Sequence, residues 1–331
     1  MSTCKKTEKL EYAQPLVYTH QTLELTNTKA LLRGKFSKGS DNITAFGFEW
    51  KKATDSDYKK VSAQVKIDNF SATITDLEED TKYYVIAFLI DASNKSYYAK
   101  LDSFITKGTV KDIDGNVYLT YRYGNKVWMT ENLRVTRFAD GTPIEARSSG
   151  KNPPSDGPVY YHDLWHTANY APGKPNFGLL YNWAAAAKAD SCNYRLITNP
   201  LDPKTSQGIC PDGWHLPSGF EWDNLINMYG GRENAASSMK TSNWADSHYP
   251  TANSSHFSTE PAGFYHWNIY NNIVNEFNGL NESAYLWTSA QHSDKNDHTM
   301  AGAYMIVNGF PKIEYSVRPK SSGNSVRCVK N

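Results

Sequence analysis

The feature that most limits the possible folds is a two-residue alternation of apolar and polar side chains in the first third of the chain. Residues 28–36, 46–50 and 70–75 each place apolar side chains at alternating positions. Successive side chains of a strand point to opposite faces, so this period is typical of half-buried strands. Turn-forming residues, such as those at 38–42, separate the runs. Several such strands within about 100 residues predict a β-sandwich over residues 11–106.

A second local signal lies where this sandwich would turn a corner. Residues 77–83 read Leu-Glu-Glu-Asp-Thr-Lys-Tyr and resemble the tyrosine corner of fibronectin type III domains. The resemblance implies that Leu77 fills the core below the corner and that the hydroxyl of Tyr83 bonds back to the chain. Glu79 stands where members of that family often have proline. Because the domain shows no cluster of titratable residues, we expect it to act as a spacer or scaffold.

The pattern of predicted secondary structure changes after the short polar stretch 106–109, where we place a domain boundary. Residues 109–331 alternate strand-like pieces with a few helices and long loops rich in Asn, Ser and Gly. The clearest helix begins at Ser218, which has the spacing of a capping box with Glu221. The apolar residues that follow at helical spacing are Trp222, Leu225, Ile226 and Tyr229. A second helix is predicted over residues 181–189, so this part is expected to be an α+β domain.

Composition limits the partners of the chain. The 35 Lys and Arg residues nearly balance 34 Asp and Glu residues, which leaves a net charge of +1. Without a strong positive field, we expect no nucleic-acid partner. No run of about 18 apolar residues occurs, so we expect no membrane-spanning segment. The 22 Tyr and 9 Trp residues suit sandwich cores and wet binding surfaces, because each ring combines an apolar body with a polar tip.

Long motifs in the second domain resemble the Fibrobacter succinogenes major paralogous domain family and follow one another in the family's order. These motifs lie at residues 112–118, 127–134, 140–144, 180–183, 208–218, 287–289 and 325–330. The resemblance covers nearly all of residues 109–331. It implies a surface or secreted protein of the Bacteroidetes or Fibrobacteres.

Two of these segments, residues 216–222 and 326–328, also resemble the fold of C-type lectins and formylglycine-generating enzymes. This resemblance implies a helix packed on small antiparallel sheets, with the first and last elements side by side and a ligand site in a long loop region. Likeness of fold does not assign a function. We therefore expect an all-β sandwich of the fibronectin type III type, followed by an α+β C-type-lectin-like domain.

The chain has four cysteines, and they form neither a CxxC motif nor a metal-spaced set with histidines. The sequence therefore predicts no metal site and no cofactor. The family motifs that contain Cys210 and Cys328 would meet near the joined ends of the domain, so the resemblance implies a disulfide between these two residues. A bridge between Cys192 and Cys210 stays open as the alternative. Export would permit either disulfide.

The remaining cysteine, Cys4, lies in the polar stretch 1–10, which we interpret as a tether. Its setting resembles the mature end of a bacterial lipoprotein, whose cysteine carries lipid. Thr3 precedes it, where Gly, Ala or Ser is usual. The resemblance implies export and anchoring at the outer membrane or cell surface, and the lipid would be the only membrane contact. An unmodified cysteine is the alternative.

Two aromatic stretches are candidate binding surfaces. Tyr161 and Trp165 belong to the first, whereas Tyr265, Trp267 and Asn268 belong to the second. Flat rings beside amides suit a sugar, because the ring covers the C–H patch while the amides bond the hydroxyls. The same composition suits a protein interface, and the rings could equally fill the core of a loop-rich domain. The sequence leaves these three interpretations open.

From the family resemblance, the aromatic loops and the lack of a recognisable catalytic set, we predict a non-enzymatic recognition or adhesion lipoprotein. Its partner would be a glycan or a surface protein. The alternatives are a protein-interaction module, a structural surface or fibre component, and a copper enzyme of the formylglycine-generating type. That enzyme uses a close cysteine pair to hold copper, and no two cysteines here are close in the sequence.

Overall fold

The computed structural model places the chain in two units, Met1–Lys107 and Gly108–Asn331. It describes residues 12–20, 22, 24–147, 160–162, 177–189, 207–245, 252–266, 276–291 and 299–331. No helix in these ranges is long and apolar enough to cross a bilayer. The predicted tether, residues 1–10 with Cys4, lies outside the described residues.

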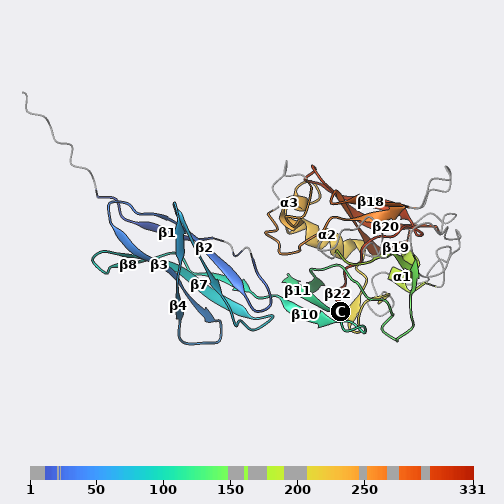
Figure 1. The fold of residues 1–331 in the computed structure, drawn as a ribbon, viewed down its shortest axis with the longest axis horizontal. Coiled ribbons are helices and arrows are strands. Elements are labelled where there is room, and N and C mark those ends of the chain that lie inside the picture. Colours follow the sequence, from blue (N-terminus) through green and yellow to red (C-terminus); the bar gives the residue numbers. More distant parts are fainter. Residues whose placement is uncertain are drawn as a thin grey trace, which may run out of the picture. The chain divides into compact units, whose positions relative to one another are not determined.

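The first unit is a β-sandwich of two antiparallel sheets (Figure 1). Its strands are β1 (Leu16–His20), β2 (Ala30–Ser37), β3 (Ile43–Lys52), β4 (Lys59–Ser62), β5 (Gln64–Lys66), β6 (Asn69–Ile74), β7 (Lys82–Asp91), β8 (Ser96–Tyr98) and β9 (Asp102–Ile105). One sheet has the order β1-β2-β6-β5, and the other has the order β4-β3-β7-β8 with β9 beside β7. The β-sandwich that the alternation predicted is confirmed.

The core of the sandwich follows from the alternation. Strand β2 pairs with β6 so that Leu32 lies opposite Ala72 and Gly34 lies opposite Phe70. Glycine is required at position 34, because a Cβ there would collide with the ring of Phe70. The corner also forms as its sequence implied. Leu77 is buried, and the hydroxyl of Tyr83 accepts a hydrogen bond of 2.9 Å from the backbone N–H of Glu78.

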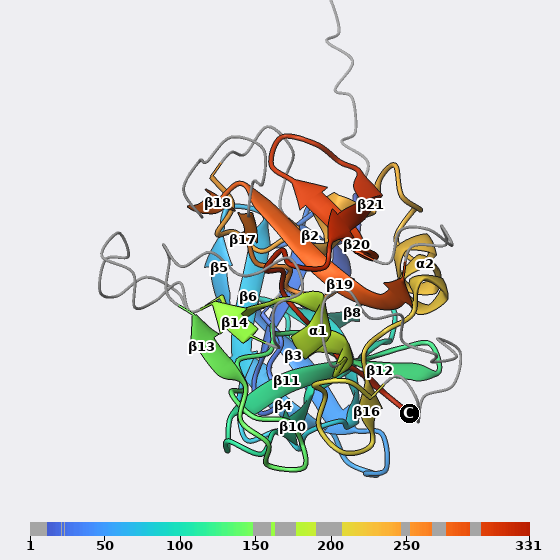
Figure 2. The same cartoon turned by 90° about the vertical axis from the view of Figure 1, so that its right-hand side faces the viewer.

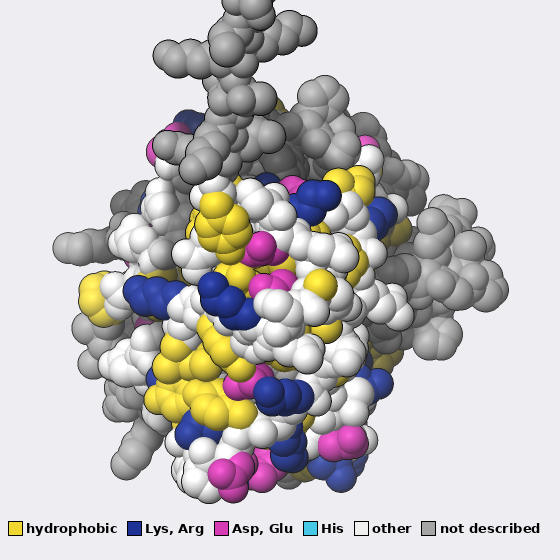
Figure 3. Space-filling model, turned by 90° about the vertical axis from the view of Figure 1, so that its left-hand side faces the viewer, with side chains coloured by type: hydrophobic (Ala, Val, Ile, Leu, Met, Phe, Trp, Pro, Cys, Tyr) yellow, Lys and Arg dark blue, Asp and Glu magenta, His cyan; other side chains and the backbone are white. Residues whose placement is uncertain are grey.

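Lysine side chains lie over aromatic rings on the sandwich. The Nζ atom of Lys59 is 5.0 Å from the ring centre of Trp50, and the Nζ atom of Lys82 is 5.2 Å from that of Tyr84. Figure 3 shows one face of the protein, on which hydrophobic side chains gather beside Lys, Arg and acidic side chains. Contacts of this kind stabilise by about 0.5–1 kcal/mol each at exposed sites, so rings can stay near the surface.

The second unit combines short helices with three sheets (Figure 2). Its elements are β10 (Gly108–Lys111), β11 (Val117–Tyr123), β12 (Lys126–Met129), β13 (Glu145–Arg147), β14 (Tyr160–His162), β15 (Leu180–Tyr181), α1 (Trp183–Ala187), β16 (Trp214–His215), α2 (Gly219–Asn227), α3 (Ala235–Met239), β17 (Ala262–His266), β18 (Glu276–Leu280), β19 (Ser283–Gln291), β20 (Met300–Val307), β21 (Ile313–Pro319) and β22 (Val329–Lys330). The sheet orders are β10-β11-β12-β22-β16, β13-β14-β15 and β18-β17-β19-β20-β21. Strand β22 pairs with both β12 and β16, so the beginning and end of the unit lie side by side.

The capping box that the sequence predicted starts α2. The side chain of Ser218 accepts a hydrogen bond from the backbone N–H of Glu221, and the carboxylate of Glu221 accepts one from the backbone N–H of Ser218. The helix then buries Trp222, whose ring centre lies 4.9 Å from that of Trp128 and 5.6 Å from that of Phe257. This aromatic contact fixes α2 on the sheet that contains β12.

The second predicted helix is shorter than expected, because α1 ends at Ala187. Asn182 caps it by accepting a hydrogen bond from the N–H of Ala185, and Lys188 ends it in the left-handed conformation. Helix α1 lies beside β19 (Figures 1 and 2), and its alanines share one apolar cluster with Trp287 and Tyr118. Small side chains let the helix pack closely in this cluster.

Candidate functional site

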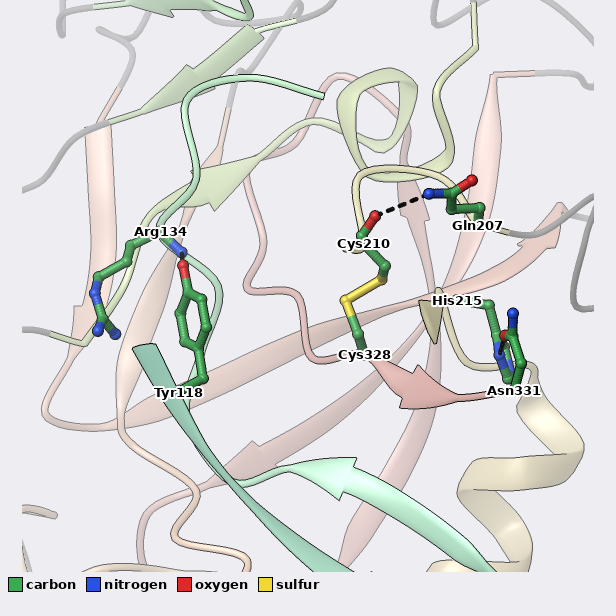
Figure 4. Close-up of a disulfide and its surroundings, with 7 residues drawn as sticks. All are labelled: Tyr118, Arg134, Gln207, Cys210, His215, Cys328 and Asn331. Carbon is green, nitrogen blue, oxygen red and sulfur yellow. Dashed lines mark hydrogen bonds between the residues drawn. A yellow bond between two sulfur atoms is a disulfide. The ribbon is translucent and has the colours of Figure 1, made fainter. Parts of the chain in front are cut away.

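The predicted disulfide between Cys210 and Cys328 is confirmed (Figure 4). The Cα atoms lie 5.9 Å apart and both residues are fully buried. The carbonyl of Cys328 accepts a hydrogen bond from Met129, and the carbonyl of Cys210 accepts one from the side chain of Gln207. The alternative bridge between Cys192 and Cys210 is therefore wrong, because Cys210 is already bonded. Cys192 itself lies outside the described residues.

His215 lies close to this disulfide (Figure 4), and each of its ring nitrogens has a partner. Its Nε2 atom is 2.9 Å from Oε1 of Glu221, and its Nδ1 atom is 2.7 Å from Oδ1 of Asn331. The same carboxylate accepts a hydrogen bond from the hydroxyl of Ser218 and lies 3.2 Å from Nζ of Lys126. His215 is 2% exposed, so the network is shielded from water. Its hydrogen bonds join the start of α2 to β16 and to Asn331.

The network makes the stability of the second unit depend on pH in the acid range. Burial acts to raise the pKa of Glu221, but the hydrogen bonds from His215 and Ser218 outweigh it and lower the pKa to about 2, from a usual value of 4.5. A lowered carboxyl pKa stabilises the fold above its unfolded value, and this contribution is lost as pH falls through the folded one. We expect Glu221→Gln to reduce the free energy of unfolding by up to about 3 kcal/mol at pH 7.

Urea unfolding of both proteins between pH 7 and pH 2 measures this effect. The difference between them should disappear as the pH falls from about 4.5 to about 2. Glu282→Gln, a substitution at an exposed position, is the matched control and should leave stability nearly unchanged. A difference between wild type and Glu221→Gln that stayed constant across this range would contradict the pH linkage.

The aromatic residues that the sequence singled out are not brought together in the described part of the protein. Tyr265, a candidate ligand-binding residue for which a core position was the alternative, is fully buried with its ring centre 5.3 Å from that of Phe277. It fills the core, because β17 pairs on both sides, with β18 and β19. Tyr161 is half-buried, and its ring centre lies 6.3 Å from that of Tyr181. The predicted residues outside the described ranges are Trp165, Trp267 and Asn268.

A site that the sequence did not indicate lies at Arg318 of β21. The guanidinium carbon of Arg318 is 4.7 Å from the ring centre of Phe264 and 4.6 Å from that of Tyr285. The two rings themselves meet edge to face with centres 4.7 Å apart. Tyr285 lies opposite Met305, and Met305 lies opposite Glu314. Because side chains alternate along a strand, Arg318 shares this face of the sheet with Glu314.

The guanidinium of Arg318 has an edge without partners. Its Nε and Nη2 atoms are both buried, and neither has a hydrogen-bond partner in the described part of the chain. These N–H groups form the fork that binds a carboxylate through two parallel hydrogen bonds. Burial lowers the pKa of Arg318, although Tyr285 acts in the opposite direction. Leaving such a donor shielded and unpaired costs roughly 1–3 kcal/mol. A hydrogen-bond acceptor placed at this edge would therefore bind favourably.

A pocket of about 180 Å³ opens on the same face of the sheet. It is lined by Met305, Val307, Phe310, Lys312 and Glu314. Met305 lies opposite Tyr285 in the β19–β20 pair, so the pocket borders the tyrosine of the arginine–aromatic stack. The stack offers a charged fork and aromatic rings, and the pocket adds a mostly apolar wall. Together they can hold a ligand that carries both a carboxylate and a C–H surface.

Among the residues that the structure describes, no group of three or more His, Cys, Asp and Glu could hold a metal ion. The two cysteines of the family motifs are bonded to each other, so neither offers a thiol in this state.

Comparisons with known proteins give one family match and several structural similarities. Residues 121–330 match the model of the Fibrobacter succinogenes major domain. The comparison with curated proteins gave no match. Among solved structures, the chain is similar to the sensor domain of the anti-sigma factor RsgI4 of Pseudobacteroides cellulosolvens, at 20% identity over 28% of this chain and 95% of that chain, with a TM-score of 0.24.

Two human domains also show similarity. One is the fibronectin type III domain of human fibronectin type III domain containing protein 3, at 18% identity over 31% of this chain and 92% of that chain, with a TM-score of 0.21. The other is titin module A71 from human cardiac muscle, at 18% identity over 26% of this chain and 88% of that chain, with a TM-score of 0.20.

Proposed function

The chain belongs to the Fibrobacter succinogenes major domain family, and from this membership we propose that it is an exported cell-surface protein of recognition or adhesion, without an enzymatic step. In this proposal the sandwich is of the fibronectin type III type and acts as a spacer. The second unit is C-type-lectin-like and presents the ligand site. A lipid on Cys4 holds the protein at the outer membrane.

The ligand that the geometry favours is an acidic sugar, such as a uronic acid. The observation that carries this proposal is the Nε–Nη2 edge of Arg318, which is buried without an acceptor in the described part of the chain. A sugar carboxylate supplies two oxygens in the plane that this fork requires. The sugar's C–H face can then lie on the apolar wall that contains Met305 and Phe310.

Binding requires the guanidinium of Arg318 to become accessible to the ligand. The free-energy cost of this movement is set by the contacts that the side chain must break. In the described part of the chain, Arg318 lies against the rings of Phe264 and Tyr285. Its Nε and Nη2 atoms make no hydrogen bond to the described residues. A cation–ring contact contributes only about 0.5–2 kcal/mol. A bidentate pair with a carboxylate makes two charged hydrogen bonds of roughly 1.5–3 kcal/mol each, which offset the loss of the two ring contacts. A neutral sugar gives no such pair, so acidic sugars are preferred.

Titration calorimetry of the full chain with trigalacturonate tests the proposal. We expect Arg318→Gln to weaken binding by about tenfold or more, since a hydrogen-bonded charged pair contributes roughly 1.5–3 kcal/mol. Arg318→Lys should restore part of the affinity, because lysine keeps the charge but lacks the fork.

Lys111→Gln removes the same charge from an exposed position of the second unit and should bind like wild type. The proposal is wrong if wild type does not bind the acidic trimer, binds a neutral galactose trimer equally well, or binds as tightly with Gln at position 318. Binding of an acidic peptide in place of the sugar would assign the site to protein recognition.

A further inference from the structure

A second polar surface lies on the first unit, on the outer face of the sheet β1-β2-β6-β5. The strand register aligns side chains in rows that cross all four strands. One row consists of His20, Arg33, Ser71 and Gln64. The next row consists of Tyr18, Lys35, Asn69 and Lys66. Because residues two apart on a strand point to the same face, both rows lie on the side opposite the core residues Leu32 and Ala72.

The face is hollowed where these rows meet. A shallow pocket of about 600 Å³ lies there, and residues from all four strands line it. The polar residues in its lining are His20, Arg33, Gln64, Lys66, Asn69 and Ser71. No acidic residue lines the pocket among those that the structure describes. The lining therefore combines positive charge with uncharged hydrogen-bonding groups.

The positive charges of this face are mostly unbalanced. Arg33 and Lys66 are exposed, and neither has an ion-pair partner among the residues placed by the structure. Lys35 is different, because its Nζ atom lies 3.3 Å from the carboxylate of Asp68. That carboxylate also accepts a hydrogen bond from the side chain of Asn69. The carboxylate of Asp68 is thus occupied by Lys35 and Asn69, and the cations Arg33 and Lys66 in the pocket lining remain for a ligand.

We propose that this face binds an anionic polysaccharide that runs across the strands. The guanidinium of Arg33 and the ammonium of Lys66 would meet carboxylate or sulfate groups. The amides of Gln64 and Asn69 would bond sugar hydroxyls. Neighbouring strands lie about 4.8 Å apart, so Arg33 on β2 and Lys66 on β5, which is two strands further on, can meet different sugar residues of one polymer. This site lies on the other unit from Arg318, so it does not depend on the function proposed above.

The mixture of groups favours a polysaccharide over a nucleic acid or a lipid surface. Single-stranded nucleic acids gain affinity from several stacked aromatic rings, and Tyr18 is the one aromatic side chain in the two rows. Binding to anionic lipid relies on dense positive charge with inserted apolar groups, whereas only three of these eight positions carry Lys or Arg. A sugar polymer uses both the cations and the amides.

The test compares full-length variants in a background of Arg318→Gln, which removes the site proposed in the second unit. Binding to immobilised polygalacturonate and to dextran sulfate is measured with neutral dextran as the blank. The double variant Arg33→Gln/Lys66→Gln should bind at least about tenfold more weakly than its parent. Binding of the parent should also weaken steeply as salt rises, because the charges are exposed. Preference for one polymer distinguishes carboxylate from sulfate.

The matched control is Lys59→Gln/Lys95→Gln, which removes two exposed charges at positions outside the two rows. It should bind as the parent does, and thermal unfolding should show that all variants stay folded. Equal affinity of Arg33→Gln/Lys66→Gln and its parent would overturn the proposal. So would tighter binding to phosphatidylglycerol vesicles or single-stranded DNA that these two substitutions abolish, or no binding to either polymer.

Discussion

Replacing Arg327 by methionine is expected to lower the free energy of unfolding of the second unit by about 3–5 kcal/mol. Arg327 is fully buried. Its Nε atom donates to Oδ1 of Asn132 at 2.8 Å, its Nη2 atom donates to the carbonyl of Ser258 at 2.7 Å, and its Nη1 atom donates to the carbonyl of Phe257. Methionine keeps most of the apolar stem but leaves these three acceptors unpaired in the core.

The charge of Arg327 is part of this effect. Burial lowers its pKa to about 10, so the group stays charged at neutral pH. Its guanidinium carbon lies 4.4 Å from the ring centre of Phe257. The carbonyls, the amide and the ring therefore stand in for the water that a charged group would otherwise need.

Urea unfolding followed by tryptophan fluorescence measures the loss, because eight of the nine tryptophans lie in the second unit. Lys330→Met is the matched control, since it removes an exposed positive charge three residues away and should change stability by no more than about 0.5 kcal/mol. A loss below about 1 kcal/mol for Arg327→Met would show that the network does not hold the unit together.

Removing the disulfide should have an effect of similar size. Cys210 and Cys328 are separated by 118 positions, and closing a loop of that length stabilises by roughly 4–5 kcal/mol in the chain-entropy view. The variant Cys210→Ala/Cys328→Ala is expected to lose that amount, together with a smaller packing loss in the core. Differential scanning calorimetry in the presence and absence of reductant measures it.

Wild type in reductant should unfold close to the temperature of the double variant, and the double variant should not respond to reductant. Thiol counting on the unfolded protein shows whether the bridge was reduced. An unchanged unfolding temperature for wild type with its bridge reduced would contradict a stabilising role.

The parts of the fold that depend on neighbours in the sequence could be predicted. Alternation alone gave the sandwich strands, because a two-residue period has one structural meaning. The pair Ser218 and Glu221 marked the start of α2, since a capping box is complete within four residues. Cys210 and Cys328 could be paired from the family motifs, although their spacing alone left the Cys192 bridge open.

The arginines that carry the central contacts could not be predicted, because their partners are distant in the sequence. Arg327 bonds Asn132 at a separation of 195 positions and Phe257 at 70. Nothing local marks Arg318 among the 35 basic residues, since its role arises where β17, β19 and β21 come together. For Tyr265 the sequence left core and surface open for the same reason, and the structure places it in the core, because strands pair on both sides of β17.

The Nε–H resonance of Arg318 gives the most direct test of the claim that its unpaired edge receives a carboxylate. In a nitrogen-15 spectrum of the full chain, assigned with Arg318→Gln and Arg327→Met, trigalacturonate should shift the Arg318 signal in proportion to saturation. The Arg327 signal should stay in place, because its donors are already occupied. Saturating binding of the trimer with no change at Arg318 would contradict the account.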